Sequence, residues 1–442
     1  MATTEQLSLG ERARRAIPGG AHTYSKGDDQ FPANAPRFIV RGEGCRVWDP
    51  DAREFIDWGM GLRTVILGHA YPRVVDAVTE AVRHGANFTR PSTVELEFAE
   101  ELIDLIPCAE MVKFAKNGSD VTTAAVRLAR AATGRDLVAF PAEHPFYSVD
   151  DWFIGTTVVD AGVPDATKRL SRTFPYGDLS ELERLLDAEG DEIALVIMET
   201  ATDSEPPPGY LAGVRELTRR HGVLLAFDEM ITGFRWHLSG SQAFYGVTPD
   251  MATFGKALGN GFSVSALAGR RDVLELGGID HAGPRVFLLS ATHGGEVHAL
   301  VAARETVAEL RERDGADQVW EVGRALQDGL QDAIADHGLT GVVRCGGYPC
   351  SPVLAFTAKD AAFTAAIRTL FLQETVNRGV LIPYIAPSLS HSPRDIELTV
   401  QAAHEALASV RLALERDTVD GLLEGPAVKP VFRRFTATDF DA

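Results

Sequence analysis

Lys256 is the first residue whose type and surroundings indicate chemistry. It stands between an apolar run at 251–254 and a glycine-rich turn at 259–261. Lysine is rarely buried without a partner, and a lysine held in a dry cleft has a lowered pKa and can form an imine with a carbonyl compound. The alternative is a surface lysine whose aliphatic stem covers apolar neighbours. The position of Lys256 alone does not decide between these two interpretations.

The pair Gly255-Lys256 is also similar to the end of a nucleotide-binding P-loop. Such a loop needs glycine at position 250 and serine or threonine at position 257, where this chain has Asp250 and Ala257. The sequence therefore excludes a P-loop at this lysine.

Two acidic residues end apolar runs that precede Lys256. Asp228 follows the run 223–227, and Glu199 follows the run 194–198. If the two runs are parallel strands, both acids lie at the carboxyl edge of the sheet, where ligands bind. A single acid at such a place more often caps the next helix. Neither Asp228 nor Glu199 therefore indicates a functional role by itself.

The segment Asn117-Gly118-Ser119-Asp120 opens a predicted helix at 119–132. Free backbone N–H groups and the helix dipole favour an anion there, although an ordinary N-cap is the more common explanation. An imine-forming lysine, an acid that pairs with a pyridinium nitrogen, and a phosphate site are together what pyridoxal phosphate requires. The pair His293 and His298 is a weak metal candidate, because the sequence offers it no patterned carboxylate partner.

These residues must be positioned by alternating helices and strands. Helices are predicted at 73–85, 94–106, 119–132 and 210–221, and buried strands at 194–198 and 223–227. This alternation predicts a parallel α/β sheet. Before it, a short helix, a turn at 18–20 and a hairpin of 46–48 with 54–58 are expected. After it come a long helical stretch at 301–334, with a break at Gly315, and short mixed elements to residue 414. A tail with little periodicity follows from residue 425.

The composition limits the classes of function. Of 442 residues, 43 are basic and 62 acidic, which gives a net charge of −19. An acidic surface of this kind disfavours nucleic acid and anionic membranes as partners. Four cysteines are too few for a disulfide framework, and no apolar run reaches the roughly 20 residues of a membrane helix. A cytoplasmic protein without a signal peptide is expected.

The motif at 227–235, FDEMITGFR, followed by FGK at 254–256, resembles the signature of class III pyridoxal-phosphate aminotransferases, and most closely their glutamate-1-semialdehyde aminomutase-like branch. Further matching segments lie at 17–20, 67–70, 111–114, 127–130 and 133–136. The resemblance implies an α/β fold-type I transferase with a large, mostly parallel-sheet domain and a smaller α+β domain. The expected parts are an N-terminal segment at 1–60, the large domain at 61–315, and a C-terminal small domain with tail at 316–442. A homodimer with shared active sites is also implied.

The resemblance assigns roles to individual residues. Lys256 matches the Schiff-base lysine, and Asp228 matches the partner of the pyridine nitrogen. The remaining expected cofactor-binding residues are Asn117, Gly118, Ser119, Asp120, Glu199, Met230 and Thr292, of which Thr292 matches a threonine that reaches the phosphate in the neighbouring subunit. The family usually has Tyr-His-Gly where the cofactor ring is stacked, and this chain departs from that pattern. His144 is the first choice for the stacking residue and Phe146 the second.

Three substrate-pocket segments differ together from the aminomutase. Lys26 stands where the mutase has an arginine that holds a carboxylate, Leu62-Arg63 replaces a Trp-Gly pair, and the run after Glu199 is rewritten. Lys26, Arg63 and Arg90 are candidate anchors for an anionic or polyhydroxylated substrate. The sequence therefore predicts an aminotransferase with an amino-acid donor such as glutamate and a small aldehyde or ketone acceptor, for example a sugar- or cyclitol-like ketone of specialised metabolism. The alternatives are glutamate-1-semialdehyde 2,1-aminomutase and a non-catalytic relative, the latter disfavoured by the presence of both Lys256 and Asp228.

Overall fold

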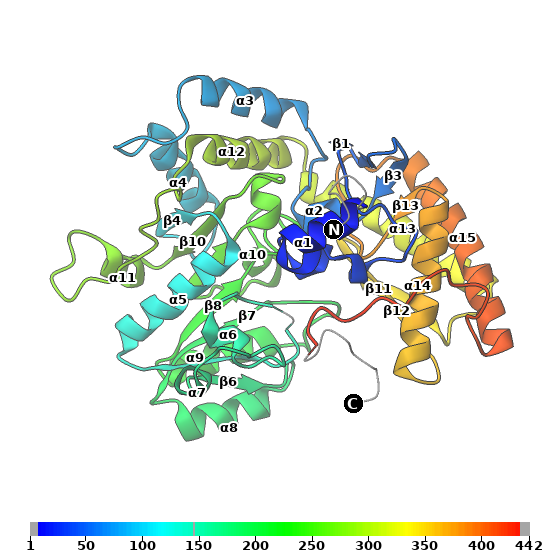
Figure 1. Cartoon of the computed structure of the whole chain (residues 1–442). Coiled ribbons are helices and arrows are strands. Elements are labelled where there is room, and N and C mark those ends of the chain that lie inside the picture. Colours follow the sequence, from blue (N-terminus) through cyan, green and yellow to red (C-terminus); the bar gives the residue numbers. More distant parts are fainter. Residues whose placement is uncertain (1–7, 145, 434–442) are drawn as a thin grey trace. The chain divides into compact units, whose positions relative to one another are not determined.

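The computed structural model describes residues 8–144 and 146–433, which form two compact units (Figure 1). The central unit runs from Gly61 to Val319. The terminal unit combines the two ends of the chain, up to Met60 and from Trp320 onward. The expected domain boundaries at residues 60 and 315 stay predictions, because compactness does not show which parts fold independently.

A seven-stranded sheet forms the middle of the central unit, in the order β4-β10-β9-β8-β7-β5-β6. Its strands are β4 Met111–Ala115, β5 Leu137–Pro141, β6 Ser171–Phe174, β7 Ile193–Met198, β8 Leu224–Asp228, β9 Met251–Phe254 and β10 Ser265–Gly269. Only β10 runs antiparallel to its neighbours, β4 and β9. The fold is therefore the expected mostly parallel α/β sheet, and the carboxyl ends of β7, β8 and β9 meet at one edge.

Helices surround this sheet in the central unit. They are α3 Pro72–Arg83, α4 Thr93–Leu105, α5 Gly118–Thr133, α6 Asp151–Ile154, α7 Asp165–Lys168, α8 Leu179–Glu189, α9 Tyr210–Arg220, α10 Ser241–Tyr245, α11 Arg271–Leu274 and α12 Val297–Glu312. The helix α5 ends at Gly134, whose φ of 68° is left-handed and costs glycine little. The helices α3 and α12 lie side by side (Figure 1), where Arg73 bonds the acids Glu305, Glu309 and Glu312.

The core of the central unit explains why its strands read as continuous apolar runs. All six residues of β7 are buried. The apolar face of α9, with Leu211, Val214 and Leu217, packs in one cluster with residues of β7 and β8. The expected amphipathic helix at 210–221 and the two expected strands are therefore confirmed to within a residue or two at each end.

The terminal unit holds a four-stranded sheet, a separate hairpin and three long helices. The sheet strands, in spatial order, are β1 Arg41–Glu43, β2 Arg46–Trp48, β3 Glu54–Asp57 and β13 Val380–Leu381. The hairpin is β11 Val343–Tyr348 with β12 Ser351–Phe356, and the main helices are α13 Gly315–Asp336, α14 Ala361–Asn377 and α15 Pro393–Arg416. The expected hairpin of 46–48 with 54–58 is confirmed as β2 and β3. The expected break at Gly315 is confirmed, because α12 ends at Glu312 and α13 begins at Gly315.

Shorter elements complete the chain. They are α1 Leu9–Ala16, α2 Met60–Arg63 and the 3₁₀ turns η2 Pro18–Gly20, η3 Tyr24–Lys26, η4 Asp28–Gln30, η5 Lys256–Gly259 and η6 Glu275–Gly277. Within the described part of the chain, no helix combines the length and apolar character needed to cross a membrane.

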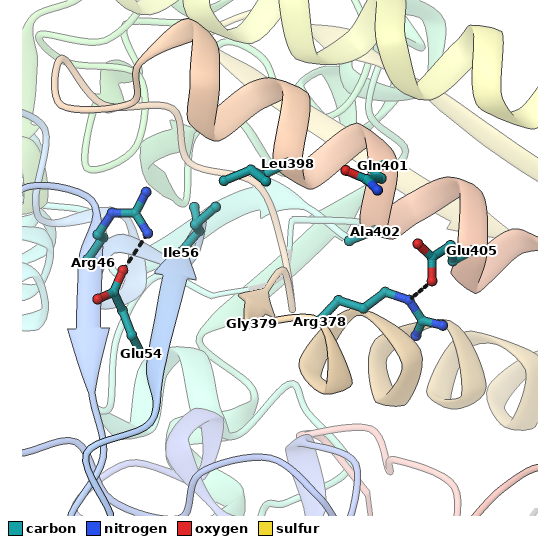
Figure 2. A pocket seen from close by; sticks show the side chains of 9 residues that line it. All are labelled: Arg46, Glu54, Ile56, Arg378, Gly379, Leu398, Gln401, Ala402 and Glu405. Carbon is teal, nitrogen blue, oxygen red and sulfur yellow. Dashed lines mark hydrogen bonds and ion pairs between the residues drawn. The ribbon is translucent and has the colours of Figure 1, made fainter.

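A cavity of about 310 Å³ lies in the terminal unit between β2, β3 and α15 (Figure 2). Arg46 bonds Glu54 at one end of it at 2.6 Å, and Arg378 bonds Glu405 at the other end at 2.6 Å. Ile56 and other apolar groups lie between these ion pairs. The charged groups of this cavity are thus paired with one another, and none of the residues expected at the active site lines it.

Candidate active site

Lys256 lies in a tight turn directly beyond the carboxyl end of β9. It begins the 3₁₀ turn η5 with a φ of 43°, a left-handed conformation that costs a residue with a side chain roughly 1–2 kcal/mol. Asn260 closes this turn and is itself left-handed. Its side-chain oxygen accepts from the N–H of Leu67 at 2.9 Å, and its amide donates to the carbonyl of Gly68 at 3.0 Å. The lysine turn is therefore fastened to the neighbouring segment 67–68.

The two expected acids lie at the carboxyl ends of β8, which is next to β9, and of β7, which is next to β8. Asp228 is the last residue of β8 and is 2% exposed, and Glu199 directly follows β7 and is 5% exposed. Oδ1 of Asp228 accepts hydrogen bonds from the N–H of Met230 at 3.0 Å and from Oγ1 of Thr253 at 3.1 Å. The carboxyl of Asp228 is thus held in one orientation by a donor in the turn after β8 and a donor on β9.

The structure brings Lys256, Asp228, Glu199 and Arg63 into one electrostatic cluster. Burial raises the pKa of Asp228 to about 6, and the positive charge of Lys256 opposes the rise. Burial also raises the pKa of Glu199 to about 8, with a further contribution from Asp228. Burial lowers the pKa of Lys256, which both acids oppose and Arg63 reinforces. An amine whose pKa is lowered beside two acids is suited to bind a carbonyl group and to transfer protons.

Arg63 enters this cluster from a strained stretch of backbone. Gly61, Leu62 and Arg63 all have left-handed φ angles, of 60°, 64° and 67°. The carbonyl of Arg63 accepts a hydrogen bond of 3.4 Å from Nη2 of Arg235, a fully buried side chain. Strained backbone conformations of this kind cluster at functional sites, so this stretch supports the assignment of Arg63 to the site.

The N-terminus of α5 presents the segment expected to bind phosphate. The carboxylate of Asp120 accepts from the backbone N–H of Asn117 at 2.9 Å and of Lys116 at 3.3 Å, so it shapes the loop instead of facing an anion. Oγ of Ser119 accepts from the N–H of Val149 at 3.0 Å. Gly118 therefore stands at the start of a 16-residue helix in a loop whose shape is fixed by side chains of the same segment.

His144 is buried beside Glu199, whereas Phe146 is not. His144 is 4% exposed, and its Nδ1 accepts from Tyr147 Oη at 2.5 Å and from the N–H of Glu199 at 3.2 Å. The proton of the neutral ring is therefore on Nε2, which is buried and has no hydrogen-bond partner among the described residues. Burial lowers the pKa of His144 to about 4 and keeps the ring neutral. Phe146 is 42% exposed and meets the edge of Phe153.

Three further expected residues lie at exposed positions of their own units. Thr292 is exposed, and its carbonyl accepts from Nδ2 of Asn87 at 3.0 Å. Arg90 is exposed on the central unit, and Lys26 is exposed in η3 of the terminal unit. Their assignments as phosphate or substrate residues stay predictions.

The pair His293 and His298 shares one carboxylate. Nδ1 of His293 lies 2.7 Å from Glu296, and Nε2 of His298 lies 3.7 Å from it. The same carboxylate accepts from Nζ of Lys116 at 2.7 Å. In residues 8–144 and 146–433 there is no group of three or more histidine, cysteine or acidic side chains that could hold a metal.

Sequence reasoning missed several residues that shape the site. Glu229, Asn260 and Tyr147 are buried and bond residues of the cluster or of its loops. One feature of the sequence could have identified Glu229: it is a second acid that directly follows Asp228 at the end of an apolar run. Nothing in the sequence identifies the backbone partners of the Glu229 carboxylate at Ser241 and Gln242, which lie 12 and 13 residues further along the chain.

Comparison with known proteins places this geometry in a family. Residues 28–407 match the family model for aminotransferases of class III. A glutamate-1-semialdehyde 2,1-aminomutase of Methanothermobacter thermautotrophicus is 35% identical over 91% of this chain and 99% of its own. A 3-aminobutyryl-CoA aminotransferase of Cloacimonas acidaminovorans is 33% identical over 92% and 98%. The PLP internal aldimine form of the FumI protein of Sphingopyxis sp. MTA144 is similar in structure, with a TM-score of 0.83, 26% identity, and coverage of 92% and 96%.

Proposed function

The chain belongs to the class III aminotransferase family, and we propose that it moves an amino group from an amino-acid donor, with glutamate as the expected donor, to a small aldehyde or ketone. The observation that carries this proposal is the position of Lys256, a half-buried lysine whose amine lies within electrostatic reach of the buried carboxyls of Asp228 and Glu199. A structural role alone would not require a lysine amine beside two buried acids.

The residues of the cluster fit pyridoxal phosphate. When bound, this cofactor supplies an aldehyde and an electron-accepting ring. Lys256 would hold the aldehyde carbon. The two hydrogen bonds that Asp228 receives from described residues are both on Oδ1, so Oδ2 would hold the proton of the ring nitrogen. The backbone N–H groups at Gly118 and Ser119 would bind the phosphate at the start of α5.

Two glycines, Gly118 and Gly255, make room for the side chain of Met230. A Cβ on Gly118 would lie 3.0 Å from Sδ of Met230, and a Cβ on Gly255 would lie 2.7 Å from the same atom. The Met230 side chain thus occupies the room between the start of α5 and the residue before Lys256. This contact supports a role for Met230 as part of the cofactor-binding wall.

Lys256 and Glu199 are placed to move and hold protons. Burial lowers the pKa of Lys256, which favours the neutral amine, the form in which Nζ can accept a proton. The raised pKa of Glu199, about 8, keeps its carboxyl protonated at pH 7, so that it adds no second negative charge next to Asp228. Arg63 supplies the positive charge that we assign to binding an anionic or polyhydroxylated acceptor.

His144 is the residue that we assign to the face of the cofactor ring. It is buried against the backbone of Glu199, and its Nε2–H is available as a donor. The exposure of Phe146 makes it the weaker choice.

A homodimer is part of this proposal. Thr292 resembles a residue that serves the cofactor phosphate of a partner subunit, and its exposure agrees with such a role. The ion pair of Glu296 with Lys116 ties the loop of Thr292 to the residue before Asn117. Light scattering of the protein loaded with cofactor tests the dimer, and an active monomer would contradict it. The cytoplasmic location expected from the sequence also stays a prediction.

The second candidate is glutamate-1-semialdehyde 2,1-aminomutase itself. The names of several relatives at 33–35% identity favour it. Against it stand Lys26 and Leu62-Arg63, which replace residues of the mutase pocket. The two candidates differ in whether a separate amino donor and acceptor are needed.

The first experiment tests Lys256. The purified protein is incubated with pyridoxal phosphate, reduced with borohydride and mapped by peptide mass spectrometry. We expect the cofactor on Lys256 and its complete loss in Lys256→Ala. The control Lys168→Ala removes a surface lysine that pairs with Asp160 and should leave the adduct unchanged. An adduct at another lysine would refute the assignment. A screen of donors and acceptors, followed by ketoacid release and amine mass, then tests the reaction.

A further inference from the structure

We propose that Glu229 is the positioning residue of this site, and that it fixes the loop 229–242 on which Asp228 and Met230 depend. The proposal rests on the proposed function, since it concerns how the cofactor-binding groups are held. Glu229 directly follows Asp228, but its own side chain is used elsewhere. It is completely buried, and its carboxylate accepts hydrogen bonds from the backbone of Ser241 and Gln242.

The Glu229 carboxylate closes the loop into a ring. Oε2 accepts from the backbone N–H of Ser241 at 2.5 Å and from Oγ1 of Thr232 at 3.0 Å. Oε1 accepts from the backbone N–H of Gln242 at 3.0 Å and from its side-chain amide at 3.2 Å. Four donors therefore converge on one buried carboxylate, which is the arrangement that makes such a charge tolerable in a core.

The loop 229–242 is also anchored to the seven-stranded sheet. The backbone N–H of Glu229 donates to the carbonyl of Thr253 in β9 at 2.9 Å, and the side-chain oxygen of Gln242 accepts from the N–H of Cys108 at 2.9 Å. Gly240 has a φ of 83°, and a Cβ there would lie 2.7 Å from Oε1 of Glu229. The loop therefore has little room to move while the carboxylate is in place.

The held loop in turn orients the cofactor-binding groups. Its second residue, Met230, donates its N–H to Asp228, and its sulfur packs against Gly118 and Gly255. Met230 thus contacts the residue expected at the ring nitrogen, the start of α5 and the turn before Lys256. A shift of the loop would move all three groups relative to one another.

The substitution Glu229→Gln separates this role from simple packing. The amide keeps the volume of the side chain, but it offers one acceptor oxygen where the carboxylate offers two. Its NH₂ group must then face a backbone N–H of Ser241 or Gln242. We expect the loop to loosen without a cavity being created.

Asp250 provides a matched control. It is a buried carboxylate, 2% exposed, which accepts from the N–H of Leu225 at 2.9 Å and pairs with Arg215 and Arg270. It precedes β9, at the strand end opposite to Lys256. Asp250→Asn should therefore lower thermal stability without altering the cofactor site.

The experiment measures the affinity for pyridoxal phosphate and the pH midpoint of its bound absorbance in wild type, Glu229→Gln and Asp250→Asn. We expect at least a tenfold weaker affinity and a displaced midpoint in Glu229→Gln, and values within twofold of wild type in Asp250→Asn. Equal affinity and midpoint in wild type and Glu229→Gln would overturn the proposal, as would equal changes in both variants. If Glu229→Gln does not fold, Thr232→Val removes a single donor, and an unchanged affinity in that variant would refute the role. A wild-type protein that binds no pyridoxal phosphate would instead refute the proposed function.

Discussion

The carboxyls of Asp228 and Glu199 end neighbouring parallel strands, and the charge of Asp228 raises the pKa of Glu199. Because the pKa of Asp228 is about 6 and that of Glu199 about 8, one negative charge stands beside Lys256 at pH 7. Two close carboxyls in a dry site generally titrate apart in this way. At pH 7, Asp228 is therefore the negatively charged partner of Lys256, and Glu199 is a neutral carboxyl group that can form hydrogen bonds.

Asp228→Asn should fold and lose most of its activity. The amide oxygen can still accept from Met230 and Thr253, but it cannot stabilise a positive ring nitrogen. A charge pairing away from water is worth several kcal/mol in a transition state, so we expect a loss of about 100- to 1000-fold in kcat. Steady-state kinetics and circular dichroism check this expectation. Activity within a few-fold of wild type would contradict the role.

Glu199→Gln should stabilise the protein without cofactor at alkaline pH. The usual pKa of 4.5 is raised to about 8 in the folded state, so the folded state retains a proton that the unfolded state releases. Stability is therefore lost as the pH rises from about 4.5 to about 8, by an amount on the order of 5 kcal/mol. The amide does not titrate. We expect its gain in Tm over wild type to grow with pH and to level off above pH 8.

Differential scanning fluorimetry between pH 5 and pH 9 measures this gain. Glu216→Gln, an exposed acid paired with Arg219, is the control and should show no such trend. A gain that is constant with pH would show that Glu199 is ionised throughout.

The sequence predicted the fold well where the pattern of apolar residues is local. The continuous runs at 194–198 and 223–227 are buried strands because helices cover both faces of the sheet. The antiparallel strand β10 was not predicted, since its residues are all buried and carry no sign of strand direction.

The site was predictable only where residue type and strand position coincide. Asp228 ends β8, and Glu199 and Lys256 follow β7 and β9, so the three residues meet at one edge of the sheet. The carboxylate of Glu229 bonds groups at 241 and 242, and the amide of Asn260 bonds groups at 67 and 68. Contacts between residues so far apart in the sequence depend on the path of the chain in the fold, which composition and periodicity do not predict.

Acid should destabilise the protein through His391. Its ring stacks on Trp58 at 3.9 Å, and burial lowers its pKa from 6.5 to about 4. The unfolded state binds a proton more readily between these values, so stability is lost as the pH falls from about 6.5 toward 4, by about 3 kcal/mol. His391→Phe preserves the stack and removes the titration. We expect its Tm to fall less than that of wild type between pH 7 and pH 5.

His84 provides the comparison for this measurement. It is 77% exposed, so His84→Phe should leave the acid dependence of the Tm as in wild type. If the Tm of His391→Phe falls with pH as steeply as that of wild type, other groups, such as His144, account for the whole acid sensitivity.

Arg63 should decide which acceptor the enzyme uses. Its guanidinium contributes to the lowered pKa of Lys256, so Arg63→Gly should raise that pKa and the pH midpoint of the bound cofactor's absorbance. Glycine takes the left-handed φ of 67° without strain, so the loop should keep its shape. We expect KM for an anionic acceptor to rise about tenfold or more, with a smaller change in kcat. Arg184→Ala, which removes an exposed arginine paired with Glu181, should change neither quantity.

The same residue separates the two candidate reactions. A mutase must hold one diamine intermediate through both half-reactions, whereas a transaminase releases a ketoacid and admits a second substrate. Lys26 lacks the planar fork with which arginine grips a carboxylate, and Arg63 changes the charge of the pocket where the mutase has glycine. We therefore expect wild-type protein to form little 5-aminolevulinate from glutamate-1-semialdehyde without an added donor. Efficient formation would show that the second candidate is correct, and a gain of that activity in Arg63→Gly would identify Arg63 as the residue that excludes it.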